Sequence, residues 1–125
     1  MPKFLIFQNT NEYELIPAGT HLFDAGDEAE YMYILIEGEL NVTQNGKTID
    51  TLNAGDIVGE MGLIDNSPRS VSAIAKTDCK VVPISLKRFM FMVEQTPFFA
   101  LHVMQVMAER LRRVTRLAHG IEDKA

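Results

Sequence analysis

The feature that most constrains the fold is a change in the spacing of apolar residues near position 85. Before it, short apolar runs are separated by clusters of Gly, Pro, Asn and Asp, and residues 40–44 alternate apolar and polar side chains as a half-buried strand does. Asn45 and Gly46 then give a strong hairpin signal, because both residues tolerate a positive φ. Many short strands at this spacing predict a mostly β fold, an antiparallel sandwich or barrel. The expected strands are residues 14–16, 20–23, 31–36, 40–44, 47–52, 57–58, 71–75 and 79–84.

After this position the pattern becomes helical. Ser85 is a suitable N-cap for a short helix over residues 86–94, since a serine hydroxyl accepts from the free N–H groups of the first turn. A long helix begins with Pro97, a residue favoured at the first helical position, and extends over residues 97–119 to a stop at Gly120. Core and helix–sheet contacts are expected from Tyr31, Tyr33, Phe89, Phe91, Phe98 and Phe99.

The long helix carries apolar residues at alternating steps of four and three, which is an a/d heptad pattern. This seam consists of Ala100, Met104, Met107, Leu111, Val114 and Ala118. One interpretation is a homodimer that forms through residues 97–119. The other is packing of the helix against the sandwich, which Leu101, Val103 and Leu117 would serve. The regular spacing favours the homodimer.

Length and composition indicate one domain covering residues 1–125. The share of hydrophobic residues, 46%, is ordinary for a soluble globular protein. No stretch of about 18 apolar residues is present, so no membrane span is expected, and the apolar start is too short for a secretory signal. Cys79 is the single cysteine, which excludes an intramolecular disulfide and fits a reducing compartment. We therefore expect a cytoplasmic protein.

The charge is distributed unevenly along the chain. A net charge of −5 argues against general binding of nucleic acids. Up to Pro68, however, there are twelve acidic and two basic residues, whereas ten basic and five acidic residues follow from Arg69 onward. The acidic segment thus carries −10 and the basic segment +5. Either they form two solvated faces that attract each other, or part of the basic segment receives an anion.

Residues 58–73 (VGEMGLIDNSPRSVSA) hold the residue types that an anion site needs. Gly59 lets backbone approach a ligand closely, and the residues after it can form one helical turn with free N–H groups. Arg69 presents a planar fork of donors to phosphate oxygens, and Ser70 adds a hydroxyl donor. Glu60 fits such a site if it accepts from a ribose hydroxyl, as acidic residues do in dinucleotide folds. The alternative is a salt bridge between Arg69 and Glu60 across the loop.

The same segment resembles that of a known family. Residues 59–63 (GEMGL), a short gap and residues 69–73 (RSVSA) resemble the phosphate-binding cassette of cyclic-nucleotide-binding domains. Residues 34–40 (ILIEGEL) and 52–56 (LNAGD) resemble the glycine-marked strand turns of this family. Residues 107–111 (MAERL) are similar to part of the long helix of the bacterial cyclic AMP receptor proteins. The resemblance covers nearly the whole chain. It implies an antiparallel β-roll or jelly-roll sandwich over residues 4–85 or so, followed by a short helix and a long helix.

The resemblance also implies a ligand and a role for each matching residue. Arg69 would pair with the cyclic phosphate, while Ser70 and the backbone of Gly62 and Leu63 would donate to its other oxygens. Glu60 would accept from the ribose 2′-hydroxyl. The sugar and the apolar walls of the site would be lined by Gly59, Val42, Val58 and Met61.

Three residues of the long helix complete the implied site. Arg110 matches an arginine that lies near the phosphate in the receptor proteins, and Thr115 matches a hydroxyl residue that reaches the purine. Val114 departs from the family pattern, because those receptors carry a second hydroxyl there. Ser70 replaces the Ala or Thr of kinase regulatory domains. These departures leave cyclic AMP and cyclic GMP both open, and we expect cyclic AMP.

Catalytic and metal sites find no support in the sequence. His21, His102 and His119 stand far apart and lack the spacing of metal ligands, so no metal is expected. No Ser or Cys stands near a His with a third orienting group in a recognisable motif. Glu60 and Asp65 have no substrate pocket apart from the nucleotide site. We expect no enzyme, and no cofactor beyond the nucleotide ligand.

The function implied is a stand-alone cyclic-nucleotide sensor that signals through residues 97–119 to a partner protein, which the sequence does not identify. Transcriptional relatives continue into a helix-turn-helix for which no segment here fits, so we expect no direct DNA binding. A solvated basic face is expected from Arg110, Arg112, Arg113 and Arg116. The alternative function is a nucleotide-independent interaction or scaffold protein on a degenerate form of the fold.

Overall fold

The computed structural model of this chain describes residue 7 and residues 11–119, with side chains described as far as residue 116. The start of the β-roll near residue 4, the helix stop at Gly120 and the side chains of Leu117 and Ala118 lie outside the described residues.

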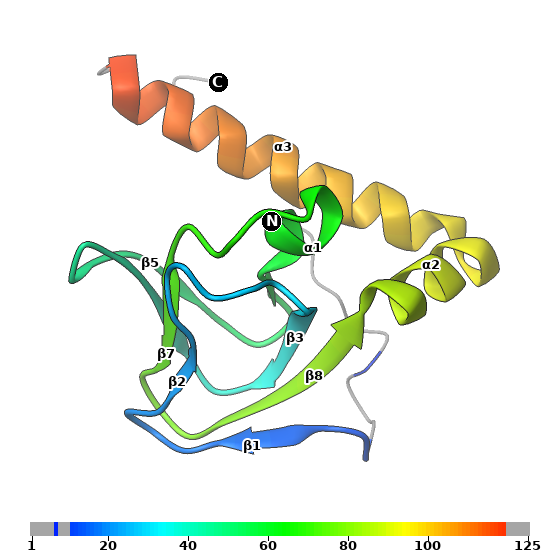
Figure 1. The fold of residues 1–125 in the computed structure, drawn as a ribbon, viewed down its shortest axis with the longest axis horizontal. Helices are drawn as coiled ribbons and strands as arrows, with labels where there is room; N and C mark the ends of the chain where they lie inside the picture. The colour runs from blue at the N-terminus through cyan, green and yellow to red at the C-terminus, as the bar shows by residue number, and fades with distance from the viewer. Residues whose placement is uncertain (1–6, 8–10, 120–125) are drawn as a thin grey trace.

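The described strands form two antiparallel sheets of four strands each, which confirms the predicted sandwich (Figure 1). The first sheet has the order β1 (Glu14–Ile16), β8 (Cys79–Ser85), β3 (Tyr31–Glu37) and β6 (Ile57–Val58). The second has the order β2 (His21–Phe23), β7 (Ser72–Ala75), β4 (Leu40–Gln44) and β5 (Lys47–Leu52). Each predicted strand is present within one residue of its expected bounds.

The hairpin between β4 and β5 illustrates why these predictions hold. Gln44 pairs with Lys47, so the turn consists of two residues, and Asn45 and Gly46 adopt φ values of 54° and 76°. A turn with two positive φ values matches the right-handed twist of the strands, and Asn-Gly adopts it at low cost. The turn is therefore encoded locally.

The first sheet is buried on both faces. Along β3, Met32 and Ile34 belong to the apolar cluster beneath the helices, whereas Leu35 belongs to the cluster between the two sheets. On β8, Val82 and Ile84 lie on the helix side, and Val81 lies on the side of the second sheet. Because successive side chains of a strand point to opposite faces, one sheet serves both cores.

Three helices cover one end of the sandwich, namely α1 (Glu60–Asp65), α2 (Leu86–Gln95) and α3 (Pro97–His119). The Ser85 hydroxyl accepts from the N–H of Arg88 at 3.2 Å, so the predicted N-cap of α2 is confirmed. In Figure 1, α3 passes across this end of the sandwich with α1 beneath it. Leu63 of α1 and Val103 of α3 share the cluster of buried residues beneath the helices.

The long helix uses one face for this packing and leaves only part of its heptad seam outside, because the seam residue Met107 packs against the core cluster. Phe99, Val103 and Val106 are buried against the sandwich. In the seam, Met104, Leu111 and Val114 are exposed by 58%, 67% and 61%. Packing against the sandwich therefore does not cover these three seam residues. Among the aromatic residues expected in the core, Phe99 is buried and Phe89 packs on its ring, but Tyr31, Phe91 and Phe98 are exposed.

Candidate functional site

The predicted anion segment begins where the first sheet gives way to α1. Gly59 follows β6 and forms the N-cap of α1 with a φ of 81°, and a Cβ atom there would collide with the guanidinium of Arg69. A Cβ atom on Gly62 would lie 2.6 Å from the Cβ of Ala29. Both glycines are therefore required by close approach, and Leu63 anchors the short helix in the core.

Arg69 is the most unusual side chain of the site, because it is a buried cation, only 7% exposed. Its Nη1 donates to the carbonyl oxygen of Gly59 at 2.8 Å, and its Nη2 donates to the carbonyl oxygen of Tyr31. Its Cζ lies 4.1 Å from the ring centroid of Phe23. Phe23 belongs to the second sheet and Tyr31 to the first, so the guanidinium lies where the two sheets and the start of α1 meet.

The backbone of Arg69 is fixed by a neighbouring turn. The N–H of Arg69 donates to the carbonyl of Asp27, and the carbonyl of Arg69 accepts from the N–H of Gly26, each at 2.8 Å. Ser72 adds a third link, since its hydroxyl accepts from the N–H of Ala25 at 2.9 Å. The turn at residues 24–27 therefore holds the cassette strand in register.

The charge of Arg69 is not neutralised by any carboxylate within the described part of the chain. Burial lowers the pKa of its guanidinium, while the nearby Tyr33, Glu60 and Asp27 act in the opposite direction. Its buried Nε has no hydrogen-bond partner among the described residues. The simple salt bridge between Arg69 and Glu60, one of the two sequence interpretations, is therefore wrong.

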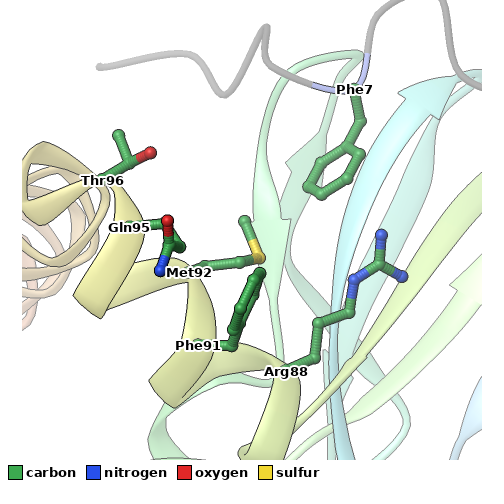
Figure 2. A pocket seen from close by; sticks show the side chains of 6 residues that line it. All are labelled: Phe7, Arg88, Phe91, Met92, Gln95 and Thr96. Atoms are coloured by element: carbon green, nitrogen blue, oxygen red, sulfur yellow. The ribbon is translucent and has the colours of Figure 1, made fainter.

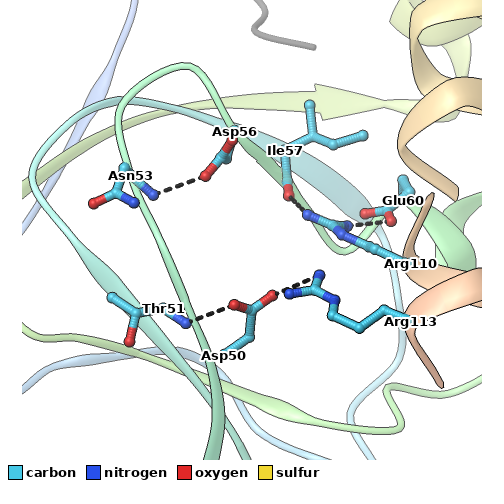
Figure 3. Close-up of polar contacts among 8 residues, drawn as sticks. All are labelled: Asp50, Thr51, Asn53, Asp56, Ile57, Glu60, Arg110 and Arg113. Atoms are coloured by element: carbon cyan, nitrogen blue, oxygen red, sulfur yellow. Dashed lines mark hydrogen bonds and ion pairs between the residues drawn. The ribbon is translucent and has the colours of Figure 1, made fainter. Parts of the chain in front are cut away.

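Glu60 instead pairs with Arg110 of α3 (Figure 3). The Glu60 residue is 2% exposed, and its Oε1 accepts from Nη1 of Arg110. Nη2 of Arg110 also donates to the carbonyl of Ile57 at 2.6 Å. The sequence expectation placed Arg110 near the phosphate, whereas the structure places its guanidinium on Glu60, the residue expected to bind the ribose. One arginine thereby joins the long helix to α1 and β6.

A second arginine of α3 reaches the sandwich one turn further along. Nη2 of Arg113 lies 3.2 Å from Oδ2 of Asp50 on β5, and Oδ1 of the same carboxylate accepts from the N–H of Thr51 (Figure 3). Arg110 and Arg113 therefore attach α3 to both sheets, through the segment after β6 and through β5.

The remaining predicted residues fall into two groups. Val42 and Val58 are buried in the cluster between the sheets, together with Phe23. Met61, Ser70, Val114 and Thr115 are exposed, and the Thr115 hydroxyl donates to the carbonyl of Leu111 at 2.9 Å. The structure thus brings together Gly59, Glu60, Arg69 and Arg110, and the hydrogen-bond and ring partners of the Arg69 guanidinium are Gly59, Tyr31 and Phe23, none of them from the exposed group.

Sequence reasoning missed the groups that hold the two arginines. Phe23 was assigned only to a strand, and the carbonyls of Tyr31 and Ile57 have no signature in a sequence. The one available signal is the position of Phe23, which directly precedes a turn-rich stretch, residues 24–27. Whether a side chain at the end of β2 reaches the cassette depends on the pairing of β2 with β7, two strands that are far apart in the chain.

A cavity of about 250 Å³ lies elsewhere, at the junction of α2 and α3. Figure 2 shows that it is lined by Phe7, Arg88, Phe91, Met92, Gln95 and Thr96. None of these residues belongs to the cassette, and the lining is mainly apolar. The cavity therefore does not coincide with the predicted nucleotide site.

The described residues contain neither a cluster of metal ligands nor a membrane-spanning helix. No group of three or more His, Cys, Asp or Glu side chains in residues 7 and 11–119 is arranged to hold a metal ion. No helix in that part of the chain is both long and apolar enough to cross a membrane.

Comparison with solved structures defines the class of the fold. The chain is similar to the crystal structure of the catabolite activator protein of Thermus thermophilus, with a TM-score of 0.79 and 27% identity. The similarity covers 86% of this chain and 53% of that one.

The particular family follows from the sequence comparison. The family model described as the cyclic nucleotide-binding domain matches residues 13–96, which include the cassette and both sheets. The chain therefore belongs to the cyclic nucleotide-binding domain family.

Two curated relatives are similar over different lengths. The chain is 33% identical over 106 residues to the cAMP-activated global transcriptional regulator CRP of Pasteurella multocida, covering 80% of this chain. It is 37% identical over 71 residues to the cAMP-dependent protein kinase regulatory subunit of Eremothecium gossypii, covering 57% of this chain. The matches span 51% of the transcriptional regulator and 16% of the kinase subunit.

Proposed function

We propose that this domain binds a cyclic nucleotide, with cyclic AMP as the first candidate, and that Arg69 receives the phosphate. The observation that carries the proposal is a buried guanidinium with no carboxylate partner in the described chain and an unpartnered Nε. Burying a charge costs free energy unless it is paired and hydrogen-bonded. A singly charged cyclic phosphate would supply both the missing charge and the missing acceptor.

The ribose is assigned to Glu60. An ionised carboxylate has about four lone-pair positions on its two oxygens, and Arg110 occupies Oε1. Oε2 can accept from a 2′-hydroxyl while the ion pair with Arg110 persists. Gly59 would line the sugar, since the absence of a side chain allows close approach there. Cyclic AMP is preferred because both curated relatives carry it in their descriptions.

The conformational response to nucleotide binding is assigned to α3, and a partner protein would bind α3 in its changed position. Glu60 would contact the ligand directly, and its ion pair with Arg110 carries that contact to the long helix. A ligand shifts a conformational equilibrium only through differential contacts with the two states. The Glu60–Arg110 pair is the contact in this structure through which nucleotide binding can change the position of α3.

Calorimetric titration of the wild-type protein tests the proposed binding. We expect saturable binding of cyclic AMP, and weaker binding of cyclic GMP. Binding to the native state alone should also stabilise the fold, by about 2.7 kcal/mol when free ligand is 100 times its Kd. Thermal unfolding with and without each nucleotide measures this gain.

The control ligand is 5′-AMP, which keeps the adenine and the ribose but has an open phosphate with a different shape and charge. If neither cyclic nucleotide releases heat or raises the unfolding temperature at millimolar concentration, the binding proposal is wrong. The nucleotide-independent scaffold role would then be the better explanation of the fold.

A homodimer through α3 is a further part of the proposal. Met104, Leu111 and Val114 form an exposed apolar stripe, and such stripes at heptad spacing associate in coiled coils. We expect Leu111→Glu to yield a monomer by light scattering, because two carboxylates would face each other in the seam. Arg112→Glu, an exposed neighbour outside the seam, serves as the charge control. If the wild-type protein is monomeric at all concentrations, with and without nucleotide, the homodimer proposal is wrong.

A further inference from the structure

The way in which Arg69 is held suggests a role for Phe23. The ring of Phe23 is 7% exposed, and the Arg69 Cζ lies 4.1 Å from its centroid, within the distance of about 6 Å at which a ring face attracts a cation. Phe23 is itself supported from behind by Tyr33, at 6.3 Å between ring centroids and with planes inclined by 25°. The ring is therefore fixed in place before any ligand binds.

All described partners of the Arg69 guanidinium are electrically neutral. The carbonyls of Gly59 and Tyr31 accept one hydrogen bond each, and the ring of Phe23 accepts none. A guanidinium has five N–H donors, so two carbonyls leave most of them available. A carboxylate in place of the ring would occupy donors and cancel the charge that a phosphate needs.

The alternative for a buried arginine is to swing toward a nearby carboxylate. Glu60 and Asp27 are both close enough to influence Arg69 electrostatically. An aromatic face at 4.1 Å attracts the cation and blocks one side of the guanidinium plane. The ring thus favours the orientation in which Nη1 and Nη2 meet the two carbonyls and the Nε–H is unpaired.

We propose that Phe23 is a positioning residue for phosphate recognition, because its ring holds Arg69 in the binding orientation without neutralising it. The proposal rests on the proposed function for the identity of the ligand. It adds a residue outside the cassette, contributed by the second sheet, to the determinants of anion affinity. The turn at residues 24–27, which hydrogen-bonds to the Arg69 backbone, belongs to the same support.

A double-mutant cycle tests the role of Phe23. Phe23→Leu keeps an apolar side chain but removes the aromatic face, and we expect about a three- to thirtyfold loss of cyclic AMP affinity by calorimetry. In the Arg69→Ala background the same substitution should change the affinity less than twofold, because the ring acts only through the arginine. Phe23→Tyr, which keeps the ring, should restore wild-type affinity.

Equal losses in the two backgrounds would overturn the proposal, since they would mean that Phe23 supports the site only by general packing. Phe89→Leu is the matched control, because Phe89 is a partly buried aromatic whose ring contacts Phe99 rather than an arginine. It should leave cyclic AMP affinity within twofold of wild type.

A spectroscopic measurement separates this proposal from the binding proposal. The ring current of Phe23 should displace the ¹H–¹⁵N signal of the Arg69 Nε–H in the nucleotide-free protein, with Arg69→Lys identifying the signal. We expect Phe23→Leu to move this signal and Phe89→Leu to leave it in place. An unmoved signal overturns the role of Phe23 whether or not nucleotide binds, whereas a wild-type protein that binds no cyclic nucleotide overturns the proposed function.

Discussion

Replacing Arg69 by alanine is expected to lower cyclic AMP affinity at least ten- to a hundredfold. Hydrogen bonds to charged groups contribute about 1.5–3 kcal/mol each, and every ~1.4 kcal/mol is tenfold in affinity. The loss should appear in calorimetric titration as a weaker Kd. The free energy of unfolding of the ligand-free protein should change by less than the free energy of binding. The substitution removes a costly buried charge at the same time as two hydrogen bonds to carbonyls, and these effects oppose each other.

Two further variants make the Arg69 experiment specific. Arg112→Ala removes an equal charge from an exposed position of α3 and should leave affinity nearly unchanged. Arg69→Lys keeps the charge but loses the planar fork, so we expect an intermediate affinity. Urea unfolding of each variant checks that the fold is retained. An Arg69→Ala protein that is folded and binds as tightly as wild type would refute the assignment of the phosphate to this residue.

The strands could be predicted because their determinants are local. The alternation of residues 40–44 and the Asn45–Gly46 turn each specify backbone conformation within a few positions, and the structure reproduces both. The helix caps behave in the same way, since Ser85 bonds to a residue only three positions further along. Topology followed from the family resemblance rather than from these local signals.

The site was only partly predictable, because its contacts join residues far apart in the chain. Glu60 and Arg110 are separated by 50 positions, and their pairing depends on where α3 crosses the end of the sandwich. Long arginine side chains can reach several acceptors, so the sequence identified Arg110 as a site residue without specifying Glu60 as its partner. Phe23 and Arg69 meet for the same reason, because the pairing of β2 with β7 brings together two strands that are far apart in the chain.

The sequence also did not determine which face of α3 packs against the sandwich. Apolar residues occur on more than one side of α3, so the pattern alone left open which side meets the sandwich. The structure selects Phe99, Val103 and Val106 for that contact and leaves Phe98 exposed, against expectation. Met104, Leu111 and Val114 of the heptad seam are thereby left exposed, whereas the seam residue Met107 packs against the core cluster.

The uneven charge distribution now has a physical explanation. Every ion pair of a lysine or arginine with a carboxylate in the described residues joins the basic segment to the acidic one. The pairs are Lys76–Glu39, Lys80–Glu37, Arg88–Glu12, Arg110–Glu60 and Arg113–Asp50. Arg69 takes no part in them. The mutual attraction of the two segments, one of the two sequence interpretations, therefore applies to these five pairs, and the anion site at Arg69 stays a proposal.

Replacing Arg110 by methionine is expected to destabilise the fold by about 3 kcal/mol, the lower end of the range for removing one partner of a buried ion pair. The side chain of Arg110 is 20% exposed, but that of Glu60 is only 3% exposed and would be left buried without its ion-pair partner. The carbonyl of Ile57 would lose its donor as well. Urea unfolding measures the change in the free energy of unfolding.

Arg113→Met is the matched control, because Arg113 lies one turn away on α3 and its pair with Asp50 is more exposed. Exposed ion pairs contribute about 0–1 kcal/mol to stability. Arg113→Met should therefore lower the free energy of unfolding much less than Arg110→Met does. The double variant Glu60→Gln/Arg110→Met should recover at least half of the lost stability, since no charge is then buried unpaired. If Arg110→Met is no more destabilising than Arg113→Met, the Glu60–Arg110 pair does not hold α3 on the nucleotide segment, and the proposed route of the signal loses its physical basis.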